Sequence, residues 1–600
     1  MVEDSKNVSL NQIASSLRKS SRDFSRWKLY KSSKWSAEAL VGMCVDDDHI
    51  QSPSVDAAII RDEIESNWNL SERENDLYLL AASLFDCKEF DRCAYFLRGA
   101  TNPCLKFLEL YSEFLSWDKK TRAAMEDVLI TGKPSKQKIR GDVNTVDDDN
   151  SRDSNHAKTS TSGDEKQSNP STILKRLNSY LEEHRFAKYE FGIGGALLYY
   201  LKGILLKLDD NKSDAMTFFL QSLSCYSFNW TCWVELLECL TRSDEALLLL
   251  KYIDEKLELQ NSTKSNVMVK FFKLAVFQEF SGNIEDFMDD FQYLHSTFPN
   301  FTFLKAQNAL INYNYMDYLN SESLFDQIVK SDPYRLDDLD TYSNILYVMQ
   351  KHSKLAYLAQ FTSQVDKFRP ETCCIVANYY SARQEPEKSI MYFRRALTLN
   401  KNCTSAWTLM GHEFVELKNS HAAIECYRRA VDMNAKDFKA WYGLGQAYEV
   451  LDMHLYSLYY FQKACTLKPL DRRMWQALAA CYSKIGNRQE AINCYERALQ
   501  LSVNLEQDTH LLFRLAELYE QIRDTENCRQ FMIRCVDVEK SSEGLVSDET
   551  AKALLWLARF ETQRKNYEEA YNYAIGVSHG SSQEIEEARA IARECRAKIQ

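Results

Sequence analysis

Small and large apolar residues recur through the central part of the chain with a period of 34 residues. The first small residue of the period is Ala377, Gly411, Gly445 or Ala479, and a second follows at Ser389, Ala423, Ser457 or Ala491. Four residues later stands a large aromatic residue: Phe393, Tyr427, Phe461 or Tyr495. Small residues facing large ones at these spacings predict two antiparallel helices per period that pack closely and interlock with the next pair.

Three tryptophans, Trp407, Trp441 and Trp475, keep the same period. The segment Trp441-Tyr-Gly-Leu-Gly-Gln-Ala-Tyr448 matches the tetratricopeptide pattern W-x2-L-G-x2-Y at every specified position. Counting in this register places repeat starts at Met268, Thr302, Leu336, Pro370, Thr404, Phe438 and Arg472. The predicted fold is therefore all-α: a tetratricopeptide-repeat solenoid, or superhelix, of antiparallel helix pairs.

The pattern weakens towards both ends of the chain and predicts seven segments. We expect a flexible tail over 1–21, an N-terminal helical layer with repeat-like pairs over 22–130, a disordered insertion over 131–171, further repeats over 172–301, regular repeats with a peptide groove over 302–505, divergent repeats over 506–580 and a final helix or tail over 581–600. The insertion is rich in Ser, Thr, Asn and Lys, contains Asp147 to Asp149 and has almost no large apolar residues, so it cannot bury a core.

Composition agrees with a helical chain and excludes several classes of protein. Only 17 Gly and 9 Pro among 600 residues are too few for the turns of an all-β protein. A net charge of −12 argues against general nucleic-acid binding, which needs a basic surface. No stretch approaches 18 consecutive apolar residues, so we expect no membrane span, and no secretory signal is visible at the N-terminus. We expect a nuclear or cytoplasmic protein.

Catalytic and metal-binding motifs are incomplete wherever they begin. Gly192-Ile-Gly194-Gly195 lacks the full dinucleotide fingerprint and follows no strand. In the zincin-like His412-Glu413, Glu416 stands in place of the second histidine. The 17 cysteines include no C-x-x-C pair, and we interpret them as buried apolar residues in a reducing compartment. We expect no catalytic residue, no metal and no cofactor.

In a tetratricopeptide array the first helix of each repeat lines the inner groove through its positions 2, 5, 9 and 12. Projection of the register selects nine candidate groove residues: Asp340, Asn344, Tyr347, Glu371, Asn378, His412, Tyr442, Gln446 and Glu449. Position 9 carries donor and acceptor groups in four successive repeats, which suits the unpaired backbone of an extended peptide. Nearby acids are able to pair with an arginine of that peptide: Asp337, Asp340, Glu371, Glu416 and Glu449. The alternative is that these side chains are only the solvated inner surface of a solenoid.

Several longer strings are far more specific than the repeat pattern: Trp35-Ser-Ala-Glu-Ala-Leu40, Leu336-Asp-Asp-Leu-Asp-Thr-Tyr-Ser-Asn-Ile-Leu346, Met410-Gly-His-Glu-Phe-Val-Glu-Leu-Lys-Asn419 and Tyr456-Ser-Leu-Tyr-Tyr-Phe-Gln-Lys-Ala464. Through them the chain resembles the subunit-eight, cell-division-cycle scaffold family of the anaphase-promoting complex (cyclosome). The resemblance implies a non-catalytic scaffold in a ubiquitin ligase that acts at mitosis. It also implies homodimerisation through the N-terminal repeats, stacking with sister tetratricopeptide subunits, and docking of the activator's basic C-box peptide in the C-terminal groove.

Two alternatives belong to other protein classes, and one lies within the same complex. A chaperone-linked adaptor for acidic C-terminal peptides needs Lys and Arg along the groove, whereas the projected inner face is acidic or neutral apart from Lys439. An enzyme with a catalytic domain after the repeats has no room, because repeats continue to about residue 575. A sister subunit of the same complex remains the third alternative.

Overall fold

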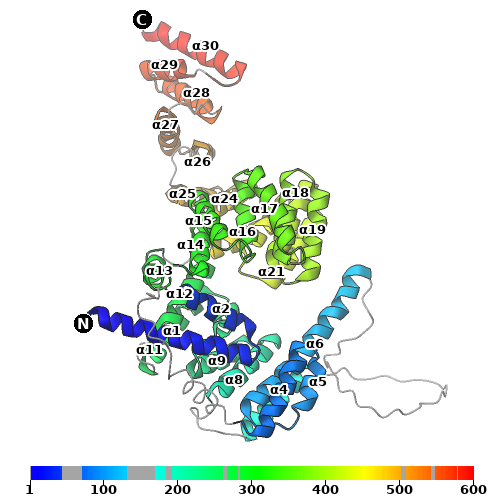
Figure 1. The fold of residues 1–600 in the computed structure, drawn as a ribbon. Helices are drawn as coiled ribbons and strands as arrows, with labels where there is room; N and C mark the ends of the chain where they lie inside the picture. Colours follow the sequence, from blue (N-terminus) through cyan, green and yellow to red (C-terminus); the bar gives the residue numbers. More distant parts are fainter. Residues whose placement is uncertain are drawn as a thin grey trace, which may run out of the picture. The chain divides into compact units, whose positions relative to one another are not determined.

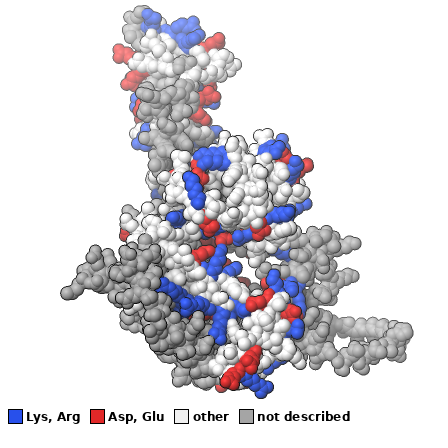
Figure 2. Space-filling view, in the orientation of Figure 1, with Lys and Arg blue, Asp and Glu red and all other residues white. Residues whose placement is uncertain are grey.

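In the computed structural model, the residues described are 2–43, 70–131, 169–183, 192–260, 266–280, 284–501, 509–541, 548–577 and 579–599. All regular secondary structure within them is α-helical (Figure 1), which confirms the predicted all-α repeat fold. The chain forms two compact units, residues 1–345 and 346–600. Acidic and basic side chains are interspersed on the visible described surface (Figure 2).

The first unit is built from fourteen described helices and most of a fifteenth. They are α1 (Val2–Arg26), α2 (Tyr30–Val41), α4 (Glu72–Asp86), α5 (Phe90–Phe96), α6 (Pro103–Thr131), α7 (Pro170–Glu183), α8 (Gly192–Leu208), α9 (Lys212–Cys225), α10 (Trp230–Cys239), α11 (Ser243–Gln260), α12 (Asn266–Phe280), α13 (Ile284–Thr297), α14 (Thr302–Asn314), α15 (Tyr318–Ser331) and α16 (Leu339–Val348), which continues into the second unit.

The second unit continues the array to the end of the chain. Its helices are α17 (His352–Val365), α18 (Pro370–Ala382), α19 (Pro386–Leu399), α20 (Thr404–Glu416), α21 (Ser420–Met433), α22 (Phe438–Val450), α23 (His454–Leu467), α24 (Arg472–Ile485), α25 (Arg488–Gln500), α26 (Thr509–Ile522), α27 (Thr525–Ser541), α28 (Asp548–Gln563), α29 (Tyr567–Gly576) and α30 (Ser582–Ile599). Five predicted repeat starts coincide with a helix start, at α14, α18, α20, α22 and α24. Helices α12 and α16 begin at Asn266 and Leu339, within three residues of their predicted starts.

Glycine permits the close approach of paired helices. A Cβ added at Gly411 on α20 would lie 2.5 Å from a ring carbon of Tyr427 on α21, and one at Gly445 on α22 would lie 2.5 Å from Phe461 on α23. The rings of Tyr427 and Phe461 are fully buried, and the small residues Ala423 and Ser457 beside them are also inaccessible. The sequence pattern of small and large residues therefore describes the actual packing surface.

The periodic tryptophans fix the linkers between repeats. The indole N–H of Trp441 donates a hydrogen bond to the Ala435 carbonyl at 2.8 Å, and that of Trp475 donates to the Pro469 carbonyl at 2.8 Å. Trp407 does the same to the Lys401 carbonyl at 3.2 Å. Each acceptor lies in the linker that enters the first helix of the repeat, so the ring holds that linker against the helix.

A left-handed residue closes the turn between the two helices of each repeat. It recurs every 34 residues, at Met316, Gln350, Gln384, Lys418, Asp452 and Gly486, with φ between 56° and 94°. Only one of these six residues is glycine, the residue that adopts such a φ without strain. The repeat geometry therefore imposes this conformation on five side chains that do not favour it.

The beginning of the chain differs from the predicted flexible tail. Residues 2–26 form α1, and Ile13, Ala14 and Leu17 within the predicted tail 1–21 are buried. Short polar runs separate the apolar residues of this segment, so its amphipathic helix was not evident from the sequence. The prediction of a tail is therefore wrong for the helix that carries these residues.

The pair α1 and α2 packs on helices far away in the sequence (Figure 1). The ring of Trp35 stacks on Trp230 of α10, with centroids 4.8 Å apart, and meets Phe271 and Phe301 edge-on. The Ser32 hydroxyl donates to the Asn229 side chain at 2.8 Å. The predicted N-terminal helical layer is thus a lateral layer against α10, α12 and α14.

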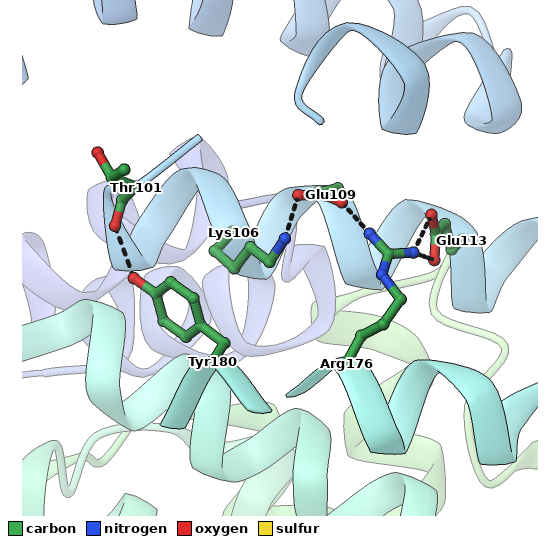
Figure 3. Close-up of polar contacts among 6 residues, drawn as sticks. All are labelled: Thr101, Lys106, Glu109, Glu113, Arg176 and Tyr180. Carbon is green, nitrogen blue, oxygen red and sulfur yellow. Dashed lines mark hydrogen bonds and ion pairs between the residues drawn. The ribbon is translucent and has the colours of Figure 1, made fainter. Parts of the chain in front are cut away.

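An ionic network around two buried glutamates joins α6 to α7 (Figure 3). The Arg176 guanidinium on α7 contacts both carboxylate oxygens of Glu113 at 2.6 Å and also pairs with Glu109, whose side chain is inaccessible to solvent. Lys106 adds a second cation to Glu109 at 2.8 Å. Tyr180 donates to the Thr101 carbonyl at 2.6 Å. Most of the predicted insertion over 131–171 lies outside the described residues, whereas Thr131 ends α6 and Pro170 begins α7.

Candidate peptide-binding face

All nine candidate groove residues lie on first helices of repeats. Asp340, Asn344 and Tyr347 lie on α16, Glu371 and Asn378 on α18, His412 on α20, and Tyr442, Gln446 and Glu449 on α22. Spacings of three and four residues keep the members on each helix close to one face. We call this set the candidate face. Asn378 is only 5% exposed, whereas Tyr347 and Gln446 are exposed.

Asp340 and Asn344 belong to the first unit, and the other seven residues belong to the second. Both are half-buried, and each already interacts with other described residues. Their contribution to one face with the other seven stays a prediction.

Neighbouring repeats are linked at position 12 of the first helix. The Ser381 hydroxyl on α18 donates to the Tyr347 hydroxyl on α16 at 3.3 Å. Asn378 lies one turn before Ser381 and is nearly inaccessible. On α18 both the predicted amide and the Ser381 hydroxyl are therefore buried, and the hydroxyl is used in the contact with Tyr347.

The imidazole of His412 forms a hydrogen bond within its own repeat. Its Nδ1 lies 2.8 Å from the hydroxyl of Tyr427 on α21. Burial, assisted by the positive charge of Lys439, lowers the pKa of His412 to about 4. The imidazole is consequently neutral at physiological pH, and one of its two nitrogens is committed to Tyr427.

Tyr442 and Gln446 are the aromatic and amide members of the candidate face on α22. Gln446 is exposed, and Tyr442 packs its ring against Phe461 with centroids 5.5 Å apart. Burial raises the pKa of the Tyr442 hydroxyl, while a hydrogen bond with Gln446 acts in the opposite direction. An aromatic ring beside an exposed amide suits an extended peptide, whose backbone needs a donor and an acceptor.

Three of the five acids expected to pair with an arginine already have basic partners. Asp337 contacts Lys34 at 3.2 Å, Glu371 contacts Arg369 at 3.4 Å and Glu449 contacts Lys484 at 2.8 Å. The sequence gives no sign of these pairs, because two of them bridge different repeats or segments. Partly exposed ion pairs of this kind contribute little to stability, so an incoming guanidinium is able to exchange into them at small cost.

Glu413 is a buried titratable group on α20 that the repeat positions did not select. It is only 5% exposed, and one of its carboxyl oxygens has no hydrogen-bond partner. Burial raises its pKa to about 7, against the opposing effect of Ser381, and the charge of Glu416 raises it further. Position 10 of the helix faces the preceding repeat, which explains why a projection onto the inner face missed it.

Within the described ranges, no group of three His, Cys, Asp or Glu side chains is arranged to hold a metal ion. None of the helices described there combines the length and apolar character needed to cross a membrane.

Helix pairs with a 34-residue period define the class: this is a tetratricopeptide-repeat protein. Sequence models of that repeat match residues 370–403, 411–451 and 473–504. The solved structure titled as the hetero-tetramer Cut9-Hcn1 of the anaphase-promoting complex has a similar fold. It superposes with a TM-score of 0.50 at 16% identity, over 88% of this chain and 96% of its own.

A more specific family model, described as anaphase promoting complex subunit 8 / Cdc23, matches residues 12–309. The anaphase-promoting complex subunit CDC23 of Saccharomyces cerevisiae is 60% identical over 99% of this chain and all of its own length. Subunit 8 of Arabidopsis thaliana is 36% identical over 98% of this chain and 96% of its own. The chain belongs to the anaphase-promoting complex subunit 8 (Cdc23) family, and the alternative of a sister-subunit family is thereby set aside.

Proposed function

We propose that this protein is a non-catalytic scaffold subunit of the anaphase-promoting complex, a ubiquitin ligase that drives mitotic ubiquitination. The observation that carries the proposal is the 60% identity to a full-length subunit of that complex, maintained over 99% of the chain. A repeat array supports such a role because each repeat contacts only its neighbours and leaves extended surfaces for partners.

Affinity purification of the tagged full chain from mitotic cells, followed by mass spectrometry, tests this membership. The expected result is recovery of cullin-like and RING subunits together with other tetratricopeptide subunits. Recovery of chaperones without these subunits would instead favour the adaptor class. Fluorescent tagging of the same protein tests the proposed distribution between nucleus and cytoplasm.

The second part of the proposal is that the candidate face binds the basic C-box peptide of the activating subunit. Support comes from Gln446 and Tyr442, which offer polar and aromatic contacts, and from Glu449 and Glu371, which hold only partly exposed basic partners. A guanidinium of the peptide replaces Lys484 or Arg369 by a bidentate pair, which is stronger than the pair it displaces.

Fluorescence anisotropy with a labelled C-box peptide tests this docking. Gln446→Ala with Glu449→Gln is expected to weaken binding about tenfold, because a charge-assisted hydrogen bond and an amide contact are lost. Gln489→Ala with Asn493→Ala is the matched control, since both residues are exposed on α25, a second helix. Unchanged binding by the first pair, or equal loss in both, would contradict the proposal.

The third part concerns self-association through the N-terminal repeats. Exposed apolar side chains on α4 and α5 support it: Leu79 is 60% exposed and Tyr95 is 64% exposed. Light scattering of the full chain is expected to give a dimer, and Leu79→Glu with Tyr95→Glu is expected to give a monomer. A monomeric wild-type protein at micromolar concentration would refute this part.

A further inference from the structure

An open groove of about 690 Å³ lies between the last two helices, α29 and α30. Tyr571 and Ile575 of α29 line one side, and Ala592 of α30 lies on the other. Ile575 is 58% exposed, although it belongs to a helix whose opposite side is packed. The groove therefore has an apolar floor that the described residues leave uncovered.

The wall formed by α30 is basic. Arg589, Arg593 and Arg596 all line the groove, at spacings of four and three residues that place them on one helix face. All three are exposed, and basic side chains are visible in Figure 2 at the end of the chain labelled α30 in Figure 1. Glu586 is the acid among the lining residues.

None of these three guanidinium groups pairs with a carboxylate of the described chain. Arg593 donates through Nε to the carbonyl of Arg589 at 3.2 Å, which leaves its terminal nitrogens available. Neighbouring acids on α30 are engaged elsewhere: Glu587 accepts from Arg559 at 2.8 Å and Glu594 accepts from Lys598 at 2.6 Å. The groove lining thus carries a net positive charge, with three arginines against the one acid Glu586.

Two simpler explanations do not account for the arrangement. Cations near a helix C-terminus are favoured by the helix dipole, but that effect is confined to the last turn and does not extend to Arg589. A terminal repeat needs a polar outer face for solubility, yet mixed charges serve that purpose, and the chain as a whole carries −12. Neither explanation places three unpaired arginines beside an open apolar floor.

We propose that the α29–α30 groove is a docking site for an acidic segment of a partner protein that also carries aliphatic side chains. The carboxylates of that segment pair with Arg589, Arg593 and Arg596, and its aliphatic groups cover Ile575 and Ala592. Planar guanidinium groups bind carboxylates in a bidentate manner, which selects glutamate and aspartate. This surface is distinct from the candidate face, which takes a ligand of opposite charge.

The test is fluorescence anisotropy with the full chain and a short fluorescein-labelled peptide that alternates leucine with pairs of glutamate. The wild-type protein is expected to bind it, with affinity falling as salt rises. The triple variant R589E, R593E and R596E is expected to bind about 10- to 100-fold more weakly, as befits three exposed ion pairs. Circular dichroism checks that the variant remains folded.

The matched control is the triple variant R497E, R514E and R534E, which changes the net charge equally at exposed arginines of α25, α26 and α27. It is expected to bind as the wild type does. A second variant, Ile575→Ser, keeps the charge and is expected to weaken binding through the lost apolar contact. Failure of the wild type to bind the peptide, equal loss in the control, or stronger binding to phosphatidylserine vesicles than to the peptide would each overturn the proposal. C-box binding is measured separately and is expected to be unchanged in both triple variants.

Discussion

At the scale of single residues, the periodic tryptophans make the same hydrogen bond in successive repeats. Trp441 is half-buried, and besides apolar burial it contributes the hydrogen bond to the Ala435 carbonyl. The same bond recurs at Trp407 and Trp475. The tryptophan therefore fixes the angle at which one repeat follows another.

Trp441→Phe is expected to lower the free energy of unfolding by about 1–2 kcal/mol, because the carbonyl loses its donor and some buried area is lost. Urea unfolding measures the change. Trp556→Phe is the control, since the Trp556 indole donates at 2.8 Å to the side chain of Glu520 and not to a backbone carbonyl of a linker. Equal losses in the two variants would show that the linker bond has no special weight.

Glu413 gives the protein a pH dependence at the residue scale. Its folded pKa of about 7 lies above the ordinary 4.5, so between these values the folded state keeps a proton that the unfolded chain releases. Stability from this group therefore falls as pH rises from 4.5 to 7 and stays lower above pH 7. Glu413→Gln is expected to be more stable than wild type at pH 8, by on the order of 2 kcal/mol, and about equal at pH 4.5.

Chemical denaturation at the two pH values measures the effect of Glu413→Gln. Glu416→Gln serves as the control, because Glu416 is exposed and acts on Glu413 only through its charge. A Glu413→Gln curve parallel to that of the wild type would contradict the assigned titration.

At the scale of elements, two features position neighbouring helices: the turn inside each repeat and the ionic contact between α6 and α7. The left-handed turn residue is the same structural position in six repeats, yet glycine occupies it only at Gly486. The other repeats tolerate the strain because the two helices on either side over-determine the turn.

Gly486→Ala is expected to destabilise the protein by about 1 kcal/mol, because φ is 94° and nothing compensates for the added Cβ. Lys418→Gly is expected to change stability by less than about 0.5 kcal/mol, since relief of strain is offset by the greater freedom of glycine in the unfolded chain. Thermal and urea unfolding compare the two. A large gain from Lys418→Gly would mean that strain outweighs chain entropy at this turn.

Arg176 is the element-scale contact with the largest expected energy. Arg176→Met leaves the buried carboxylates Glu109 and Glu113 with only Lys106, and we expect a loss of about 3–5 kcal/mol together with faster hydrogen exchange in α7. Arg92→Met removes the exposed partner of Glu89 and is expected to cost less than about 1 kcal/mol. Similar losses for both would show that the network at α6 and α7 is no stronger than a surface pair.

At the scale of the whole molecule, a repeat array should respond locally to a local defect. In Gly445→Val the new side chain overlaps Phe461, since even a Cβ would lie 2.5 Å from that ring. Hydrogen exchange is expected to quicken in α22 to α25 and to stay unchanged in α8 and α9. Uniform quickening throughout the chain would indicate one cooperative unit instead.

Periodic packing residues made the fold predictable from the sequence, whereas contacts that cross the period did not. Residues such as Gly411 and Tyr427 indicate a helix pair, because close packing restricts the residue type at both positions. The left-handed turns gave no signal, since Lys418 or Asp452 in such a turn resembles any polar loop residue. The register predicted that the candidate residues lie on first helices, and the structure places them there. It did not predict the pairing of Glu449 with Lys484 or of His412 with Tyr427, because these contacts depend on how neighbouring elements meet.

The lateral packing of α2 has a consequence for synthesis of the chain on the ribosome. Trp35 is buried by residues that leave the ribosome much later. The last of these aromatic partners, Phe303, follows it by 268 residues. At translation rates of about 5–20 residues per second, this delay is roughly 13–54 seconds. For most of that interval, until Trp230 emerges, the Trp35 ring lacks all of its aromatic partners in the later helices. Nascent chains stalled before residue 270 are therefore expected to recruit chaperones to this pair, and chains stalled well after residue 303 are expected to release them.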